Sequence, residues 1–181
     1  MRTFGLTLLT LAYPVLVYFG LGQQIEPRWL ALILVAIALL RAAFGRERVW
    51  LVAAGGALVL AAFSFWGNQA MPLKLYPVLV SVTLLCVFSI SLVYPPTVIE
   101  RLARLHEPQL PPSGIAYTRR VTQVWCGFFI FNGSISLLTA LFASDAVWAL
   151  YNGMISYVLM GVLFVGEWLV RKRVKAKAAH A

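Results

Sequence analysis

Long runs of apolar residues, separated by short polar and basic stretches, dominate the chain. An α-helix that spans the hydrocarbon core of a bilayer needs about 20 predominantly apolar residues. Six stretches come near that length: residues 3–21, 29–44, 49–66, 75–94, 121–142 and 146–170. The pattern therefore predicts an all-α, polytopic membrane protein with six transmembrane helices, in a single domain that covers residues 1–181.

The second stretch is the weakest of the six. Its uninterrupted apolar part, residues 29–40, ends at Arg41. The Arg41 guanidinium can extend toward the interface while its methylene stem stays in the apolar layer, so a full span is compatible with the sequence. A re-entrant hairpin formed by the first two stretches is the alternative, and the sequence leaves it open.

The composition is that of a membrane protein. Hydrophobic residues make up 61% of the chain and charged residues 12%, against about 45–50% and about 25% in a typical soluble domain. A net charge of +9 would suggest nucleic-acid binding in a soluble protein, but here the Lys and Arg residues lie mainly between or after the apolar runs. We therefore interpret them as a topology signal and expect no nucleic-acid partner.

The distribution of Lys and Arg predicts the orientation. With the N-terminus in the cytoplasm, 13 of the 15 basic residues fall on the cytoplasmic side, and only Arg28 and Lys74 fall outside. Cytoplasmic loops of membrane proteins carry the excess of Lys and Arg. The sequence therefore predicts that both termini are cytoplasmic, and that a basic tail, residues 171–181, is attracted to anionic lipid.

The predicted cytoplasmic loop between the fourth and fifth helices, residues 95–120, is long for so small a chain. Within it, Thr97 is a favourable N-cap for a short helix over residues 97–106, which a proline-rich stretch follows. A helical wheel places apolar residues on one side and charged residues on the other, which predicts an amphipathic helix at the membrane interface. The two sides are Val98, Ile99, Leu102 and Leu105, against Glu100, Arg101 and Arg104.

Four arginines of this loop are candidates for contact with anionic lipid head groups. Arg101 and Arg104 lie on the polar side of the predicted amphipathic helix, and Arg119 and Arg120 come just before the fifth helix. A basic residue near an anionic surface contributes about 1 kcal/mol of attraction. The alternative is that the loop is only a tether between two distant helix ends.

Glu167 is the only acidic residue within an apolar stretch. A charge in a membrane span is costly unless it is paired. We expect Glu167 to pair with Arg171 on its own helix, or with Arg41, Arg119 or Arg120 at the same depth. A role in proton relay is the alternative.

Three further intramembrane polar residues are candidates. Asn132 lies in the middle of the fifth helix, and Asn152 and Ser156 lie in the outer half of the sixth. Such residues normally serve packing and interhelical hydrogen bonds. Contact of Asn132 with a substrate is the alternative.

The chain lacks the patterns that catalysis normally needs. It has no paired carboxylates on one helix face, no HExxH, no GxSxG and no phosphate-binding loop. Its two cysteines, Cys86 and Cys126, lie within apolar stretches and lack the spacing of a disulfide framework or a zinc site. We therefore expect no catalytic residue, no metal and no cofactor, and a protein that is not an enzyme.

Several stretches resemble bacterial inner-membrane proteins. They include a proline-bearing first helix, Leu-Pro-Pro at 110–112, Trp-Cys-Gly-Phe-Phe at 125–129 and a basic tail after the sixth helix. This layout resembles the septation protein A family, also called intracellular septation proteins. Residues 74–77, 94–101, 117–122 and 148–153 are more similar to small membrane proteins encoded beside fatty-acid-like synthesis genes, including aryl polyene pigment clusters.

Both resemblances imply the bacterial inner membrane and a role in building or maintaining the cell envelope. The first hypothesis is a non-enzymatic scaffold or accessory factor for envelope lipid or septal synthesis, with membrane lipids and envelope-synthesis proteins as partners and a homo-oligomer as one option. The second is a small transporter or flippase for a lipid-linked product. It requires a polar cavity, in one copy or between two, on which Asn132, Asn152, Ser156 and Glu167 converge.

Overall fold

The structure, a computed structural model, describes residues 13–44 and 48–179, with side chains described over 13–40 and 54–173. These residues form helices joined by short connections and no β-strand. The all-α fold class is therefore confirmed. Predictions that concern residues 3–12, the side chain of Arg41 or the far part of the basic tail lie outside the described residues.

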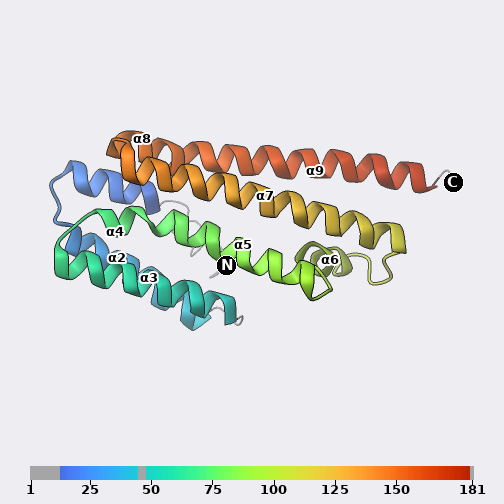
Figure 1. The fold of residues 1–181 in the computed structure, drawn as a ribbon, viewed down its shortest axis with the longest axis horizontal. Helices are drawn as coiled ribbons and strands as arrows, with labels where there is room; N and C mark the ends of the chain where they lie inside the picture. Colours follow the sequence, from blue (N-terminus) through green and yellow to red (C-terminus); the bar gives the residue numbers. More distant parts are fainter. Residues whose placement is uncertain (1–12, 45–47, 180–181) are drawn as a thin grey trace.

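The described part opens with a helix over Tyr13–Gly22. The remaining elements are α2 (Pro27–Phe44), α3 (Arg48–Gly67), α4 (Met71–Lys74), α5 (Tyr76–Val93), α6 (Val98–Arg104), α7 (Pro112–Phe142), α8 (Asp145–Leu150), the π-helical turn η1 (Tyr151–Ile155) and α9 (Ser156–Ala179). Figure 1 shows an elongated bundle in which α9 runs along α7 and the α2–α3 pair forms the opposite edge. α5 lies between them and packs against both α7 and α3.

The apolar core lies around α4, where α2, α3 and α8 meet. Leu34, Ile37, Leu73 and Trp148 are fully buried there. The large apolar side chains of α9, in contrast, are mostly exposed. Outward-facing apolar side chains suit a lipid environment, because the hydrocarbon around them is as apolar as they are.

Three helical stretches of the described chain are long and apolar enough to cross a membrane: Met71–Val93, Pro112–Phe142 and Asp145–Arg173. The first joins α4 and α5, and the third joins α8, η1 and α9. By length and composition, these three helices bear out the prediction of a helical membrane protein. The other apolar helices with described side chains, Tyr13–Gly22, Pro27–Leu40 and Ala54–Gly67, are shorter, so helix length does not extend the finding to six spans.

Two helix boundaries differ from the ends of the apolar runs. α7 begins at Pro112, well before the apolar run, so Arg119 and Arg120 lie on a helix rather than in a loop. Proline suits a first helical position because its φ is preset and it lacks an N–H that would have no partner there. α9 continues to Ala179, through most of the predicted tail. Hydropathy marks the end of the apolar layer, whereas a helix continues as long as its backbone hydrogen bonds do.

The length of α7 carries its polar start beyond the apolar layer. At a rise of about 1.5 Å per residue, its 31 residues span about 46 Å, against about 30 Å for the hydrocarbon core. The first turns of α7 and the last turns of α9 lie at the same end of the bundle as α6 (Figure 1).

Candidate functional site

The two ends of the bundle differ in charge. At the end with α4 and α8, the two described cations each pair with an acid, Arg28 with Glu26 and Lys74 with Asp145. The other end holds α6, the start of α7 and the end of α9 (Figure 1), and there the described side chains include seven Arg and Lys residues and three glutamates. The candidate site therefore lies at this α6 end.

A polar cap fixes the start of α6. The hydroxyl of Thr97 accepts a hydrogen bond from the backbone N–H of Glu100 at 3.2 Å. This is the N-cap that the sequence predicts, and it satisfies one of the backbone donors that a helix leaves free at its start. The Ser91 hydroxyl accepts a bond from the N–H of Val98 at 3.1 Å, which ties α6 to the end of α5.

The prediction that Glu100 faces outward with the arginines is wrong. Glu100 is 5% exposed and lies with Ala103 on the buried side of α6. Its carboxylate is paired there, because Nε and Nη2 of Arg104 donate to its Oε1 at 3.0 and 2.7 Å. A helical wheel places every charge outside, whereas a charge with a hydrogen-bonded partner can be buried.

Arg104 and Arg101 consequently differ in their availability. Arg104 is engaged by Glu100 and also donates from Nη1 to the carbonyl of Pro108 at 3.2 Å, so it links α6 to the turn that follows. Arg101 is exposed, and its Nε donates to the carbonyl of Pro96 at 3.0 Å. A guanidinium has five N–H donors, so this bond leaves Arg101 able to bind a head group.

Exposed apolar side chains accompany Arg101. Leu102 and Leu105 are 53% and 77% exposed, and Val93 and Tyr94 at the end of α5 are exposed as well. We call these five residues, Val93, Tyr94, Arg101, Leu102 and Leu105, the α6 corner. A cation beside exposed apolar side chains matches the boundary between hydrocarbon and head groups, where each finds a suitable environment.

Arg119 and Arg120 lie on the early turns of α7, which packs against α6. Both side chains are exposed. The structure therefore brings the four predicted arginines to one end of the bundle, with three of them exposed and Arg104 held by Glu100.

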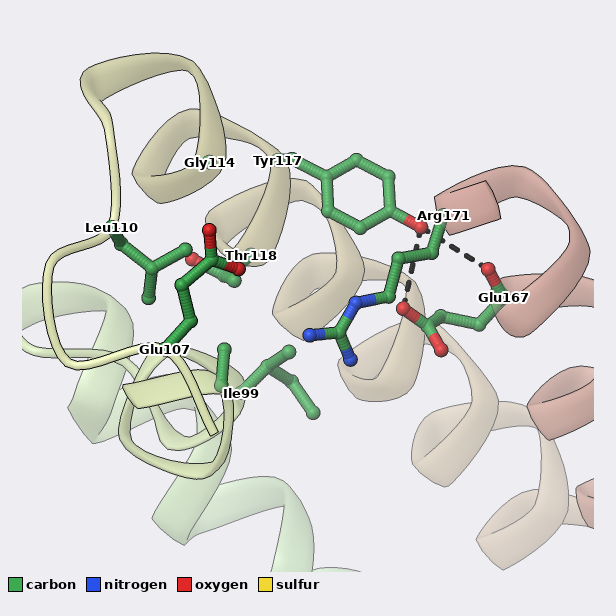
Figure 2. Close-up of a pocket in the computed structure, with 9 residues that line it drawn as sticks. Ile99, Glu107, Leu110, Gly114, Tyr117, Thr118, Glu167 and Arg171 are labelled. Atoms are coloured by element: carbon green, nitrogen blue, oxygen red, sulfur yellow. Dashed lines mark hydrogen bonds between the residues drawn. The ribbon is translucent and has the colours of Figure 1, made fainter. Parts of the chain in front are cut away.

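A small cavity of about 60 Å³ lies between α6, α7 and α9 (Figure 2). Tyr117 on α7 and Glu167 on α9 meet at its edge: the Tyr117 hydroxyl lies 3.3 Å from Oε1 of Glu167 and 3.2 Å from its backbone carbonyl, and donates to them. The rings of Trp125 and Phe164, with centroids 4.6 Å apart, join the same two helices deeper in the bundle.

The expected ion pair of Glu167 with Arg171 is not formed. Among the described residues, Glu167 takes part in no ion pair, and its side-chain partner is Tyr117. Arg171 lines the same cavity, but it forms no ion pair with Glu167. A neutral hydroxyl on another helix leaves no charge pattern in the sequence, which is why Tyr117 escaped the prediction.

Asn132 lies in a buried hydrogen-bond network between α5, α7 and η1. Tyr151 donates from its hydroxyl to Oδ1 of Asn132 at 3.1 Å. Nδ2 of Asn132 in turn donates to the Ser81 hydroxyl at 3.3 Å. Both ends of the Asn132 amide therefore have partners on neighbouring elements.

Asn152 lies in η1 and is 2% exposed. Its Oδ1 accepts from Ser136 at 2.7 Å, and its Nδ2 donates to the carbonyl of Trp148 at 2.9 Å. Ser156 donates to the carbonyl of Asn152 at 3.2 Å. None of Asn132, Asn152 and Ser156 lines the cavity beside Glu167, so the four candidate polar residues do not converge on it.

The structure also joins residues that the sequence did not connect. Lys74 pairs with Asp145, and its backbone carbonyl accepts a bond from the Trp148 indole at 3.1 Å. The Tyr13 hydroxyl donates to the carbonyl of Leu73 at 3.1 Å. Asp145 is the only aspartate of the chain and Lys74 one of two predicted outside cations, a coincidence that could have suggested the pair.

The chemistry at the α6 end consists of guanidinium groups, carboxylates and a tyrosine hydroxyl. Across the part of the chain that the structure describes, no three His, Cys, Asp or Glu side chains gather closely enough to hold a metal ion. This set of groups suits the binding of charged head groups by ion pairing and hydrogen bonding.

No family model, no curated protein and no solved structure matches this chain. The resemblance to the septation protein A family and to the aryl polyene cluster proteins therefore stays a prediction.

Proposed function

We propose that this chain is a non-enzymatic membrane protein that binds anionic lipid head groups at its α6 end and supports cell-envelope synthesis as a scaffold or accessory factor. The α6 corner carries the proposal, because Arg101 is exposed beside the exposed Leu102 and Leu105. The leucines can enter the apolar boundary of a leaflet while the guanidinium stays among phosphates.

In this proposal the chain crosses the bacterial inner membrane six times, with both termini and the α6 end in the cytoplasm. Two features support the orientation. The cations at the α4 end, Arg28 and Lys74, are paired with acids, whereas the α6 end has a surplus of cations. A cationic surface matches the cytoplasmic side, where Lys and Arg accumulate and the leaflet is anionic.

Partners other than lipid follow from the resemblance and form part of the proposal. Arg119 and Arg120 add an exposed basic pair on α7 beside α6. With the α6 corner anchored in the leaflet, this pair faces the cytoplasmic side, where an acidic surface of an envelope-synthesis protein could dock. A homo-oligomer would present several copies of this basic surface.

A small transporter or flippase for a lipid-linked product is the second hypothesis. It requires a shared polar cavity for its substrate. Asn132 and Asn152 have hydrogen-bond partners on neighbouring elements, and Glu167 lines a separate small cavity. Because these polar residues do not share one cavity within a single copy of the chain, the arrangement favours the scaffold hypothesis over the transporter hypothesis.

Lipid enrichment around the reconstituted protein tests the proposal. The full chain is placed in nanodiscs of phosphatidylcholine with a minor fraction of phosphatidylglycerol, and the lipids retained on extraction are quantified. Because a cation near an anionic surface contributes about 1 kcal/mol, Arg101→Gln should lower phosphatidylglycerol enrichment roughly fivefold. Arg28→Gln, at the opposite end, is the control and should change it little. Equal losses for both would reject the α6 end as the lipid contact.

A further inference from the structure

The start of α9 is packed far more tightly than the rest of that helix. Ser156, its first residue, is buried, and the π-helical turn η1 before it carries the buried Tyr151 and Asn152. Beyond Ser156, none of the α9 side chains that the structure describes is buried. α7, in contrast, has buried residues along most of its length, from Thr118 to Ala140. α9 is therefore anchored at its start and loosely packed from there on.

Contacts at two levels join the loosely packed part of α9 to α7. The rings of Trp125 and Phe164 lie with their centroids 4.6 Å apart. Nearer the α6 end, the Tyr117 hydroxyl donates to Oε1 and to the backbone carbonyl of Glu167, at 3.3 and 3.2 Å (Figure 2). Among the described residues, Tyr117 makes the only side-chain hydrogen bonds between α7 and α9.

A bilayer does little to keep two apolar helices together. Lipid tails are as apolar as the side chains that they would replace, so transmembrane helices associate through close packing and interhelical hydrogen bonds instead. Large apolar side chains of α9, such as Val162 and Val165, are already exposed. The bond between Tyr117 and Glu167 is therefore the specific interaction that holds the far part of α9 against α7.

The turn η1 provides a point at which the helix can bend. A π-helical turn interrupts the regular i→i−4 bonds of an α-helix, and sharp bends of helices occur at such turns. Directly after η1, the Ser156 hydroxyl donates to the carbonyl of Asn152 at 3.2 Å. A bond from a serine to the carbonyl four residues before it also favours bending. Two features of the chain therefore place a bend at the packed start of α9.

We propose that α9 moves as one helix about η1, between the closed position seen in the structure and an open position in which its far part leaves α7. The bond between Tyr117 and Glu167 holds the closed position. Opening moves Glu167 and Arg171 away, and these two residues form the α9 side of the cavity between α6, α7 and α9. The surface of that cavity is almost wholly apolar, so acyl chains of the bilayer can fill the space that α9 leaves. The movement does not depend on the proposed lipid contact at the α6 corner.

Distances between spin labels on α7 and α9 test the movement. The full chain, with Cys86→Ala and Cys126→Ala, is labelled at Ala116→Cys and Val170→Cys and reconstituted in phosphatidylcholine nanodiscs. Both positions are exposed, and they lie near Tyr117 and Glu167 in the chain. Pulsed electron spin resonance should resolve a shorter, closed distance and a longer, open one. A single narrow distance in this chain and in every variant below would overturn the inference.

A second label pair reports on the part of the bundle before the bend. Leu138→Cys and Leu150→Cys are at exposed positions, and Leu150 is the last residue before η1. Movement about η1 should leave the distance between these labels unchanged. If this pair broadens as much as the first, the bundle loosens as a whole and the inference is overturned.

Tyr117→Phe removes the bond to Glu167 and keeps the ring. The average coupling measured for interhelical hydrogen bonds in membranes corresponds to a factor of roughly three, so the ratio of open to closed should rise about threefold. Glu167→Gln still accepts from Tyr117 and should raise it less. Tyr94→Phe, the same change at an exposed tyrosine after α5, is the control and should not alter it. An unchanged ratio in Tyr117→Phe would overturn the inference.

Variants of η1 test the position of the bend. Deletion of Met154, an exposed residue of η1, should turn the π-helical turn into a regular α-helix. Combined with Tyr117→Phe, this deletion should restore the closed distance. Ser156→Ala removes the bond to the Asn152 carbonyl without a deletion, and it should also lower the open population in Tyr117→Phe. If neither change reduces opening, the bend does not lie at η1 and the inference is overturned.

Discussion

Lys74 forms an ion pair with Asp145 where α4 meets the first turn of α8. The side chain of Lys74 is only 12% exposed, whereas that of Asp145 is 47% exposed. The backbone of α4 also accepts hydrogen bonds from the Trp148 indole and the Tyr13 hydroxyl. This junction therefore holds three separate parts of the chain together at the end opposite the candidate site.

Breaking this pair should be more harmful than removing it. In Asp145→Asn the Lys74 ammonium stays largely buried without its partner, and we expect a loss of about 1–2 kcal/mol of stability, since Asp145 is half-exposed and solvent screens part of the interaction. Lys74→Met keeps the apolar stem and should cost less. Thermal unfolding of the purified protein in detergent gives the order directly.

The double variant and a matched pair make this test specific. Lys74→Met with Asp145→Asn should recover most of the stability lost in Asp145→Asn alone, because no uncompensated charge remains. Glu26→Gln breaks the exposed pair with Arg28 and should cost no more than about 1 kcal/mol. A larger loss for Glu26→Gln than for Asp145→Asn would contradict the account.

The bond from Tyr151 to Asn132 should contribute to stability as an interhelical bond. Measured couplings of this kind in membrane helices average about 0.6 kcal/mol and reach about 1.7 kcal/mol. A double-mutant cycle of Tyr151→Phe and Asn132→Leu should return a value in this range. Thr83→Val is the control, because the Thr83 hydroxyl bonds within its own helix, to the carbonyl of Leu79. A coupling near zero would mean that the two side chains do not interact.

The sequence was sufficient for features that depend on local pattern. The apolar runs predicted the helices, since a run of apolar residues lowers the cost of burial in lipid wherever it occurs. The cap at Thr97 was predictable because it needs only a hydroxyl three residues before a backbone donor. Both features are local, so no knowledge of the rest of the fold was required.

Features that depend on contacts between distant segments could not be predicted. Glu100 is buried because Arg104 and the packing against α7 allow it, whereas the helical pattern alone placed it outside. Glu167 meets Tyr117 because α7 begins at Pro112 and runs beside α9. The cavity forms only where α6, α7 and α9 pack together, so no sequence motif could predict it.

The side of the membrane on which the connection between the first two helices lies distinguishes a six-span topology from a re-entrant hairpin. In the six-span proposal, Gln24 faces the periplasm, and Gln24→Cys should react with a thiol reagent that cannot cross the inner membrane, in a background with Cys86→Ala and Cys126→Ala. A hairpin predicts no reaction in intact cells. Gln69→Cys should react in either case, because it follows the third helix, and it serves as the positive control.

The same background tests the orientation of the α6 end. Gln109→Cys, in the exposed connection between α6 and α7, should be protected from the impermeant reagent in intact cells and should react in inverted vesicles. The excess of cations at this end is the physical reason. Labelling of Gln109→Cys in intact cells would reverse the proposed orientation.

The depth of α6 in the membrane is the most direct consequence of the α6 corner. Leu102 and Leu105 are exposed on a helix whose charged residue Glu100 is turned inward, so the outward side of α6 offers apolar contact with Arg101 beside it. In a bilayer this arrangement should place Leu105 at the boundary of head groups and acyl chains. A spin label at Leu105→Cys, in the cysteine-free background, should therefore show higher accessibility to oxygen than to a polar nickel complex. Gln109→Cys, which should lie in water, is the matched control. If both labels were equally accessible to the nickel complex, α6 would be a tether in the cytoplasm and the proposed lipid contact would be lost.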